Sequence, residues 1–479
     1  MDAPRLRVTA VDLFESTYRM RLPFRFGAIT VTGGQQAIVR LRIRLPDGRE
    51  GEGFAADALA AKWFDKDARL SDEDNQHQLR ASLQQAREAY LAAPPLSAFA
   101  LFAQHHGPLQ QAGARRGLNP LVASYGPALL DRAVLDALCR LEGVGLWQAL
   151  HANLPGIEAA SVAPDLARLD LPAFLAGQQP LRRLAARHTV GLLDPITAAD
   201  VAADAQVHDG LPQTLEEVIA AYGNRHFKIK LSGQPGADLP RLGRIAALLD
   251  TQPPGWAVTL DGNEQFEDAA AVLALWRQMR ADPALVSLCA AVRFIEQPIA
   301  RGRALAAPLP DLQGLPPLLI DESDGELDAF VRARQLGYRG VSTKACKGFY
   351  KSILNRARCL LWNAASPADP CFMSAEDLTT LPGLALQQDL ALVAWLGIGD
   401  VERNAHHFVD GFQGRPAAEA QAFLAAHPDL YQATPAGPRL RIVGGELAVG
   451  SLAAAGFGTT VSPTLDETPA MPASAWPAG

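Results

Sequence analysis

Three apolar stretches in the middle of the chain each end in a carboxylate. They are "WAVTLD" (256–261), "VRFIE" (292–296) and "PLLID" (317–321), which end at Asp261, Glu296 and Asp321. If these stretches are neighbouring strands of a parallel sheet, the carboxylates meet at one edge and repel one another. A divalent cation would remove the repulsion, and all-oxygen ligands favour Mg²⁺, with Mn²⁺ as the alternative. A single acid at a strand end is commonly a helix N-cap, but three in succession favour a metal site.

Lysines flank this acidic trio on both sides along the sequence. In "HFKIKL" (226–231), Lys228 and Lys230 alternate with apolar residues, which is the pattern of a strand with one apolar face. In "GVSTKACK", Lys344 ends an apolar stretch and Lys347 follows it. Ammonium groups that lie side by side in a protein interior need negative charge nearby, and the acidic trio would supply it.

These residue types together predict proton transfer next to a carboxylate. A lysine is a poor base at its unperturbed pKa of ~10.4, but a second ammonium and a dication both disfavour its charged form. We therefore expect Lys228 and a bound cation to make Lys230 a better base. Removing a proton next to a carboxylate places a second negative charge on that group, and a metal ion can stabilise the resulting enediolate.

The elements that would position these residues follow a βα rhythm from residue 188 onward. Eight apolar stretches predict an α/β fold with a (β/α)₈ TIM-like barrel, and no GxGxxG or Walker A sequence supports a nucleotide-binding sheet. A barrel brings the C-terminal ends of its strands to one mouth, where the acids and lysines would meet. The predicted strands are 188–194, 226–231, 256–261, 292–296, 317–321, 340–344, 371–377 and 400–404. The predicted helices between them include 267–280, 326–336, 349–364 and 384–396.

The chain is long enough for two domains, and its texture changes near residue 165. We expect an α+β region over 1–165, the barrel over 185–435, and a C-terminal segment over 436–479 that returns to the N-terminal region. The Pro- and Ala-rich end after Asp466 is predicted to be a loose tail.

Within the N-terminal region, the alternation over 5–55 predicts strands that turn at Asp47-Gly48. Helices are predicted over 74–93 and 128–141, with a Pro- and Ala-rich loop between them.

Composition narrows the function classes. The chain has 479 residues, of which 48% are hydrophobic and 20% charged, with a net charge of −7 and no basic runs, so a nucleic-acid surface is not expected. No stretch approaches the ~20 apolar residues of a membrane span, and the N-terminus lacks the features of a signal peptide. Five widely spaced cysteines without a CxxC pair fit reduced thiols, and we expect a cytoplasmic protein.

The series "KIK", "LDGNEQF", "FIEQPI", "LIDES" and "STKACKG" resembles the enolase superfamily, and within its mandelate racemase/muconate lactonizing enzyme-like members the muconate-lactonizing-enzyme subgroup. That subgroup carries a KxK strand, three acidic metal ligands on successive strands and a further lysine on the next strand. The resemblance covers nearly the whole chain. It implies a barrel with an α+β capping domain, built from the N-terminal region and the C-terminal segment, and a homo-oligomer. It also implies roles for the site residues: Asp261, Glu296 and Asp321 as Mg²⁺ ligands, Lys230 and Lys344 as paired acid and base, Lys228 as the neighbour that tunes Lys230, and Asn263 as a nearby contact.

Other parts of the chain carry the resemblance less regularly. "RLPFRFGAITVTGG" resembles a mobile capping loop, "DGREGEGFAAD" the turn after the cap hairpin, and "DRAVLDALCRLEG" the helix that leads to the barrel. The chain is longer than usual for the family, with extra residues in 74–127 and 160–215. "CKGFYKS" stands where Gly-Gly commonly follows the last lysine, which leaves Lys344 and Lys347 as alternatives. We choose Lys344 because it ends the apolar stretch and matches the family position.

Specificity in this family is set by the capping loop (here around 22–34), by the following turn (around 51–60) and by the ends of the last two strands. Dipeptide-epimerising relatives carry an Asp-x-Asp that holds an ammonium. Glu402 and Asn404 stand at these positions here, so the match is partial. An ordinary loop or supporting role is the alternative for each of these residues, and for His407 beside them. The candidate substrate contacts are Asn263, Lys347, Glu376, Asp377, Glu402, Asn404 and His406.

The expected reaction depends on the two lysines, which lie on strands two and six of eight. A planar enediolate between them would have a lysine on each face, which favours a racemase or epimerase acting on a small carboxylic acid or a dipeptide-like substrate. The same residues fit a lyase or dehydratase that eliminates a β-substituent from an acid sugar or hydroxy acid, and they fit a cycloisomerase. An alternative of another class is a barrel that binds a carboxylate without turning it over.

Overall fold

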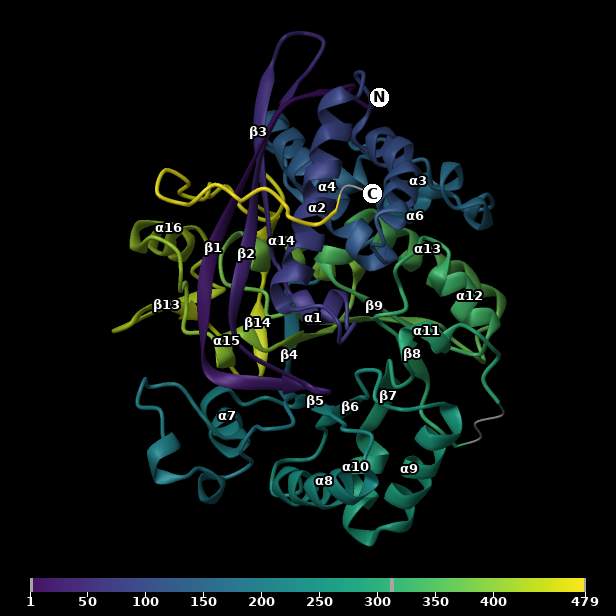
Figure 1. The fold of residues 1–479 in the computed structure, drawn as a ribbon, viewed down its shortest axis with the longest axis vertical. Helices are drawn as coiled ribbons and strands as arrows, with labels where there is room; N and C mark the ends of the chain where they lie inside the picture. The colour runs from purple at the N-terminus through teal and green to yellow at the C-terminus, as the bar shows by residue number, and fades with distance from the viewer. Residues whose placement is uncertain (1–2, 311–313, 478–479) are drawn as a thin grey trace.

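Eight parallel strands close into a barrel in the computed structural model, which describes residues 3–310 and 314–477 (Figure 1). The strands follow one another in sequence order, and the last pairs with the first, so the barrel has no open edge. Each predicted stretch forms one strand, which confirms the (β/α)₈ barrel. The strands are β4 (Arg183–Val190), β5 (His226–Lys230), β6 (Ala257–Asp261), β7 (Val292–Glu296), β8 (Leu318–Ile320), β9 (Gly340–Thr343), β10 (Phe372–Ala375) and β11 (Asp400–Arg403).

Helices follow the barrel strands. The four predicted helices are confirmed to within three residues as α9 (Ala269–Ala281), α12 (Ala329–Gln335), α13 (Phe349–Ala365) and α14 (Leu384–Leu396). Every residue of α14 is buried, because the N-terminal region packs over this helix. The other barrel helices are α7 (Leu215–Tyr222), α8 (Pro235–Leu249), α10 (Val286–Ala291), α11 (Arg301–Ala304), α15 (Ala405–Phe408) and α16 (Ala417–Ala426).

The N-terminal region contains a three-stranded antiparallel sheet of β1 (Arg7–Phe26), β2 (Ile29–Arg44) and β3 (Glu50–Ala58). β2 and β3 join at the predicted turn, where Gly48 has a φ of 90°. β1 and β2 join at Gly27, and their long hairpin reaches down to the barrel near β5 (Figure 1). The segment 22–34, expected to be a capping loop, is therefore the tip of a hairpin, in which Phe24 pairs with Val31.

Helices complete the cap. They are α1 (Ala61–Phe64), α2 (Asp72–Ala92), α3 (Ala98–Arg115), α4 (Pro120–Glu142), α5 (Leu146–His151) and α6 (Leu171–Gly177). Two of them, α2 and α4, pack against this sheet, while the others pack against neighbouring helices. α2 and the second half of α4 match the helices predicted over 74–93 and 128–141, and α4 begins earlier because Asn119 caps it. The loop predicted between them is wrong, since most of it is α3. Ser97 caps α3, and its many alanines favour a helix.

The C-terminal segment contacts both the barrel and the cap. β12 (Tyr431–Thr434) and β13 (Gly437–Leu440) form a hairpin, and β14 (Glu446–Ala448) pairs antiparallel with β4 of the barrel. The chain after Asp466 then runs along β1, where Ala470 bridges Phe14, and Trp476 Nε1 donates to the Arg116 carbonyl at the end of α3 (2.9 Å). The segment thus returns to the cap, but hydrogen bonds hold the end that was expected to be loose. The domain boundaries stay predictions.

None of the helices over residues 3–310 and 314–477 combines the length and apolar character needed to cross a membrane. All five cysteines are free thiols, as their spacing suggested, and four of them are buried. Burial raises the pKa of the Cys139 thiol well above its usual range, so this side chain packs as a small neutral group.

A buried ion pair within the cap is hydrogen-bonded to the barrel. Arg132 on α4 donates to Asp57 Oδ2 at the end of β3 (2.7 Å) and to Gln388 Oε1 on barrel helix α14 (3.2 Å). Gln388 donates in turn to the Phe54 carbonyl (2.7 Å). Burial raises the pKa of Asp57 to about 6, although Arg132 acts to lower it, so the ionised carboxylate depends on this guanidinium.

Arg132→Met should lower the free energy of unfolding by about 3–5 kcal/mol, because it leaves Asp57 buried without its cation. The midpoint of urea unfolding measures this change. Arg115→Met, at an exposed position on α3, is the matched control. Adding Asp57→Asn to Arg132→Met should recover part of the loss, and an Arg132→Met protein as stable as the control would contradict the role of this pair.

Candidate active site

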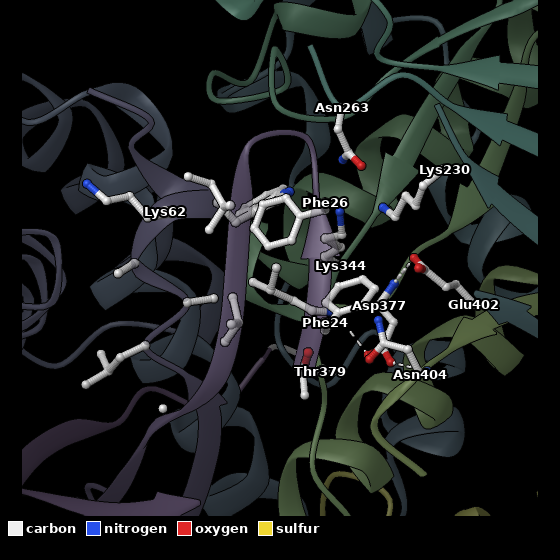
Figure 2. Close-up of a pocket in the computed structure, with 18 of the residues that line it drawn as sticks. Phe24, Phe26, Lys62, Lys230, Asn263, Lys344, Asp377, Thr379, Glu402 and Asn404 are labelled. Carbon is white, nitrogen blue, oxygen red and sulfur yellow. Dashed lines mark hydrogen bonds between the residues drawn. The ribbon is translucent and has the colours of Figure 1, made fainter. Parts of the chain in front are cut away.

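A cavity of about 90 Å³ lies between the mouth of the barrel and the cap. Figure 2 shows Phe24 and Phe26 on the cap hairpin, facing the barrel side chains of Lys230 and Lys344. The two walls therefore differ in chemistry: the cap side is mostly apolar, with Tyr18, Lys62, Asp72 and Gln76 as its polar groups, and the barrel side is mostly charged. The barrel residues that line the cavity are Lys228, Lys230, Asp261, Asn263, Asp321, Lys344, Asp377, Leu378, Thr379, Glu402 and Asn404.

Lys228 lies at the centre of the charged groups. Its Nζ is 2.9 Å from Asp261 Oδ2 and 3.0 Å from Glu296 Oε1. It also donates to Glu376 Oε2 (2.8 Å) and to Glu402 Oε2 (2.9 Å). All five side chains are buried, so one ammonium holds four carboxylates from four strand ends together.

Lys230 and Lys344 face the same cavity from opposite sides of the barrel. Lys230 ends β5, the second barrel strand, and its Nζ donates to Asp261 Oδ2 (2.6 Å). Lys344 follows β9, the sixth strand, and donates to Asp321 Oδ2. The structure thus brings together the two lysines that the sequence proposed as acid and base, each beside a different carboxylate.

The titration of these groups reflects the crowding of charge. Burial acts to lower the pKa of Lys228, but Asp261 and Glu296 outweigh it and raise that pKa well above its usual value. Burial also acts to lower the pKa of Lys344, but the carboxylates of Asp321 and Glu296 outweigh this effect and raise that pKa. Burial acts to raise the pKa of Glu402, and Lys228 holds it well below the usual range. In this arrangement Lys228 and Lys344 are ammonium ions.

The predicted metal ligands lie at the ends of adjacent strands, β6, β7 and β8. Among the residues that the structure describes, however, no three His, Cys, Asp or Glu side chains lie close enough together to hold a metal ion. Lysine ammonium groups bridge the acids instead. The three carboxylates are still suitable ligands for a divalent cation, because such ions prefer oxygen atoms. Burial and the nearby Asp261 raise the pKa of Glu296 well above its usual range, so negative charge is in excess at this position.

Lys347 does not line the cavity. Its Nζ lies behind the cavity wall, where it donates to Ser342 Oγ (2.8 Å) and contacts Asp324 Oδ2 (2.9 Å). Of the two alternatives left open by the sequence, the structure therefore places Lys344 in the cavity and Lys347 outside it.

The acids at the ends of β10 and β11 already have partners. Asp377 accepts from the backbone amides of Leu378 (2.9 Å), Thr380 (3.0 Å) and Asn404 (2.8 Å). Glu402 accepts from Thr189 Oγ1 (2.6 Å) as well as from Lys228. Both line the cavity, but their oxygens hold the barrel loops in place.

Glu376, another candidate contact, does not line the cavity. It lies beneath the wall, where it accepts from Lys228 and pairs with the fully buried Arg187.

Two asparagines line the cavity with free acceptor groups. The side-chain oxygens of Asn263 and Asn404 are buried and have no hydrogen-bond partner within residues 3–310 and 314–477. Asn263 has a φ of 42°, and Thr379, which also lines the cavity, has a φ of 54°. Non-glycine residues with positive φ concentrate at functional sites, where the surroundings hold them in place.

The two histidines after β11 lie away from this cavity. His406 lines a separate hollow of about 520 Å³ beside Tyr222 and Arg439. Burial lowers the pKa of His406 to about 3, so it is neutral. The carbonyl of His407 accepts from Arg21 Nη1 (2.9 Å). The interpretation of His406 as a substrate contact is therefore wrong for this cavity, because the short helix α15 turns its side chain outward.

The aromatic side of the site was largely missed in the sequence analysis. Trp63, on α1, lies over Lys344 with the ammonium 4.3 Å from the ring centre. The Lys230 ammonium likewise lies over the Phe24 ring, 6.0 Å from its centre. Trp63 and Phe24 lie in cap segments whose residue spacing is not typical of a catalytic motif. Only the resemblance of 22–34 to a capping loop pointed to Phe24, and nothing pointed to Trp63.

Comparison with known proteins gives a fold but no sequence family. No family model and no curated protein matches the chain. Solved structures do match over nearly its whole length. A dipeptide epimerase from Enterococcus faecalis V583, in complex with Mg and the dipeptide L-Leu-L-Tyr, is 13% identical, with a TM-score of 0.59 over 94% of this chain and 99% of that one.

Two further structures show the same likeness. The L-Ala-D/L-Glu epimerase from Bacillus subtilis is 15% identical, with a TM-score of 0.57 over 96% of this chain and 100% of that one. The 2-chloromuconate cycloisomerase from Rhodococcus opacus 1CP is 18% identical, with a TM-score of 0.57 over 95% and 97%. The chain therefore has the capped-barrel fold of the enolase and mandelate racemase/muconate lactonizing enzyme structures, as the resemblance implied.

Proposed function

We propose that this chain is a Mg²⁺-dependent enzyme that removes the proton next to a substrate carboxylate, and that it acts as a racemase or epimerase. The observation that carries this proposal is the placement of Lys230 and Lys344, which face one cavity from the second and sixth strands of the barrel. A substrate between them presents one face to each lysine. A proton removed on one face and returned on the other inverts the α-carbon.

The two lysines would take opposite roles in each direction of the reaction. Lys230, whose Nζ donates to Asp261 Oδ2 (2.6 Å), would remove a proton on its own face of the substrate. Lys344 is an ammonium beside Asp321 and can donate one.

Asp261, Glu296 and Asp321 are the residues that would hold Mg²⁺, with Mn²⁺ as the alternative. When bound, the ion would supply positive charge for the second negative charge of the deprotonated carboxylate. Binding requires these carboxylates to give up part of their present contacts with lysine. The similar epimerase in complex with Mg supports this assignment.

The walls of the cavity favour a small carboxylic acid with an apolar group. Phe24, Phe26 and Leu59 give the cap side an apolar surface next to the polar groups of Tyr18, Lys62, Asp72 and Gln76. Asp377 and Glu402 already accept hydrogen bonds from backbone amides and Lys228, which makes each a weaker partner for the ammonium of a dipeptide. Lyase and cycloisomerase reactions would use the same lysines, and their products distinguish them.

In deuterated water, the wild-type protein should introduce deuterium at the α-carbon of its substrate and invert that carbon. Suitable probes are N-acetyl-leucine, leucyl-leucine and gluconate, which represent an apolar acid, a dipeptide and an acid sugar. Lys230→Ala and Lys344→Ala should each lower inversion about 10³-fold, because each removes one of two proton carriers. Each variant should still exchange one enantiomer, and a different one in each case. Proton NMR measures both quantities.

Lys351→Ala is the matched control, because Lys351 is a buried lysine that lies outside the cavity and pairs with Asp324, which is not a proposed metal ligand. It should retain exchange of both enantiomers. Exchange of the same enantiomer in both alanine variants would contradict the two-lysine arrangement. Loss of water or ring closure without inversion would favour the lyase or the cycloisomerase, and binding without exchange would favour a non-catalytic barrel.

Lys228→Met should lower the free energy of unfolding by about 3–5 kcal/mol, because four buried carboxylates lose their shared cation. Thermal unfolding in the presence of EDTA measures the loss, and added Mg²⁺ should restore part of it. Lys62→Met is the control, since the Lys62 ammonium donates only to the carbonyls of Asp67 and Leu70. If no variant responds to Mg²⁺, the metal assignment is wrong.

A further inference from the structure

The end of the cap helix α1 is fixed to the barrel by one arginine. Arg301, the first residue of α11, donates through Nη2 to the Trp63 carbonyl (2.8 Å) and through Nη1 to the Phe64 carbonyl (2.8 Å). Trp63 and Phe64 are the last two residues of α1. The guanidinium therefore fixes the backbone from which the Trp63 side chain extends.

Arg301 is itself held in place by a carboxylate. Glu264 accepts from Arg301 Nε at Oε1 (2.9 Å) and from Nη2 at Oε2 (2.8 Å), which is the bidentate geometry that makes arginine pairs specific. Lys66 of the cap lies 2.6 Å from Glu264 Oε2 and 3.1 Å from Glu322 Oε1. We call the set of Lys66, Glu264, Arg301 and Glu322 the clamp.

The barrel members of the clamp follow the three acid-bearing strands. Glu264 lies three residues after Asp261, and Glu322 directly follows Asp321. Arg301 begins the helix after the strand that ends at Glu296. The clamp thus joins the cap to the loops that carry the candidate metal ligands, and not to a remote surface.

Trp63 extends from this fixed backbone over Lys344. Its side chain is buried, and the Lys344 ammonium lies 4.3 Å from the ring centre. The carboxylate of Asp321 contacts the same ammonium. A lysine has a long flexible side chain, so two partners restrict it far more than one.

We propose that Trp63 is a positioning residue for Lys344 and that the clamp sets the place of its ring. The ring face attracts the ammonium and limits its movement toward the cap, while Asp321 holds it from the barrel side. The part that concerns proton transfer rests on the proposed function. The clamp and the restriction of Lys344 do not depend on it.

The first test measures the freedom of Lys344 without any substrate. Reductive methylation of the full-length protein with formaldehyde, read by peptide mass spectrometry, reports how readily each lysine reacts. Trp63→Leu should raise the labelling rate of Lys344 about tenfold, and Trp63→Phe, which keeps an aromatic face, should restore most of the protection. Lys347, outside the cavity, should label equally in all three proteins. Unchanged labelling of Lys344 in Trp63→Leu would overturn the proposal.

The second test addresses the clamp. Arg301→Lys keeps the charge beside Glu264 but replaces the planar guanidinium, whose separate Nη1 and Nη2 reach the two carbonyls, by a single nitrogen on a flexible chain, so amide hydrogen exchange over residues 61–67 should become about tenfold faster. Arg303→Lys is the matched control on the same helix, because Arg303 is exposed and forms a long ion pair of 3.7 Å with Glu267. Equal exchange in the two variants would show that the clamp does not hold this segment.

The third test separates this inference from the proposed function. If the wild-type protein exchanges the α-proton of a probe, Trp63→Leu should slow the exchange that depends on Lys344 about tenfold and leave the exchange that depends on Lys230 within about twofold. Equal slowing of both would make Trp63 a general part of the wall and overturn its positioning role. If no probe exchanges, the proposed function fails, and the labelling and amide-exchange results still decide this inference.

Discussion

The balance of buried charge at the barrel mouth is the constraint on which the site depends. Four carboxylates meet at the single ammonium of Lys228, and further acids and lysines surround them within a region that water scarcely reaches. Such charges are tolerated only when each has a partner in good geometry. Closure of the barrel satisfies this condition, because it brings Glu402 on the last strand beside Lys228 on the second. The site is thus a consequence of closure and not of any one segment.

The cap adds the other half of the environment. Its hairpin and α1 place aromatic rings against Lys230 and Lys344, so the lysines lie between carboxylates on one side and ring faces on the other. An apolar wall strengthens each charge interaction beneath it, because it keeps the local dielectric low. In the proposed function, the same wall would favour an apolar group on the substrate.

Much of this architecture could be predicted from the sequence, because strand and helix periodicities are local. All eight barrel strands and the bounds of α14 followed from apolar patterns. The partners of Lys228 could not be predicted, since Glu376 and Glu402 lie 148 and 174 residues away and only closure brings them near. Composition misled at α3, where alanine and proline suggested a loop. His406 was misplaced because a single turn of helix decides which way its side chain points.

The choice between Lys344 and Lys347 shows where local reasoning ends. β9 stops at Thr343, and the chain then enters a turn, so the alternation of a strand no longer assigns the next side chains to one face or the other. Lys344 still has extended backbone and continues the inward direction of the strand, toward Asp321. Lys347, three residues later in the turn, points behind the wall to Asp324. Two lysines close in sequence therefore serve different purposes, one facing the cavity and the other neutralising a buried acid, and only the path of the turn distinguishes them.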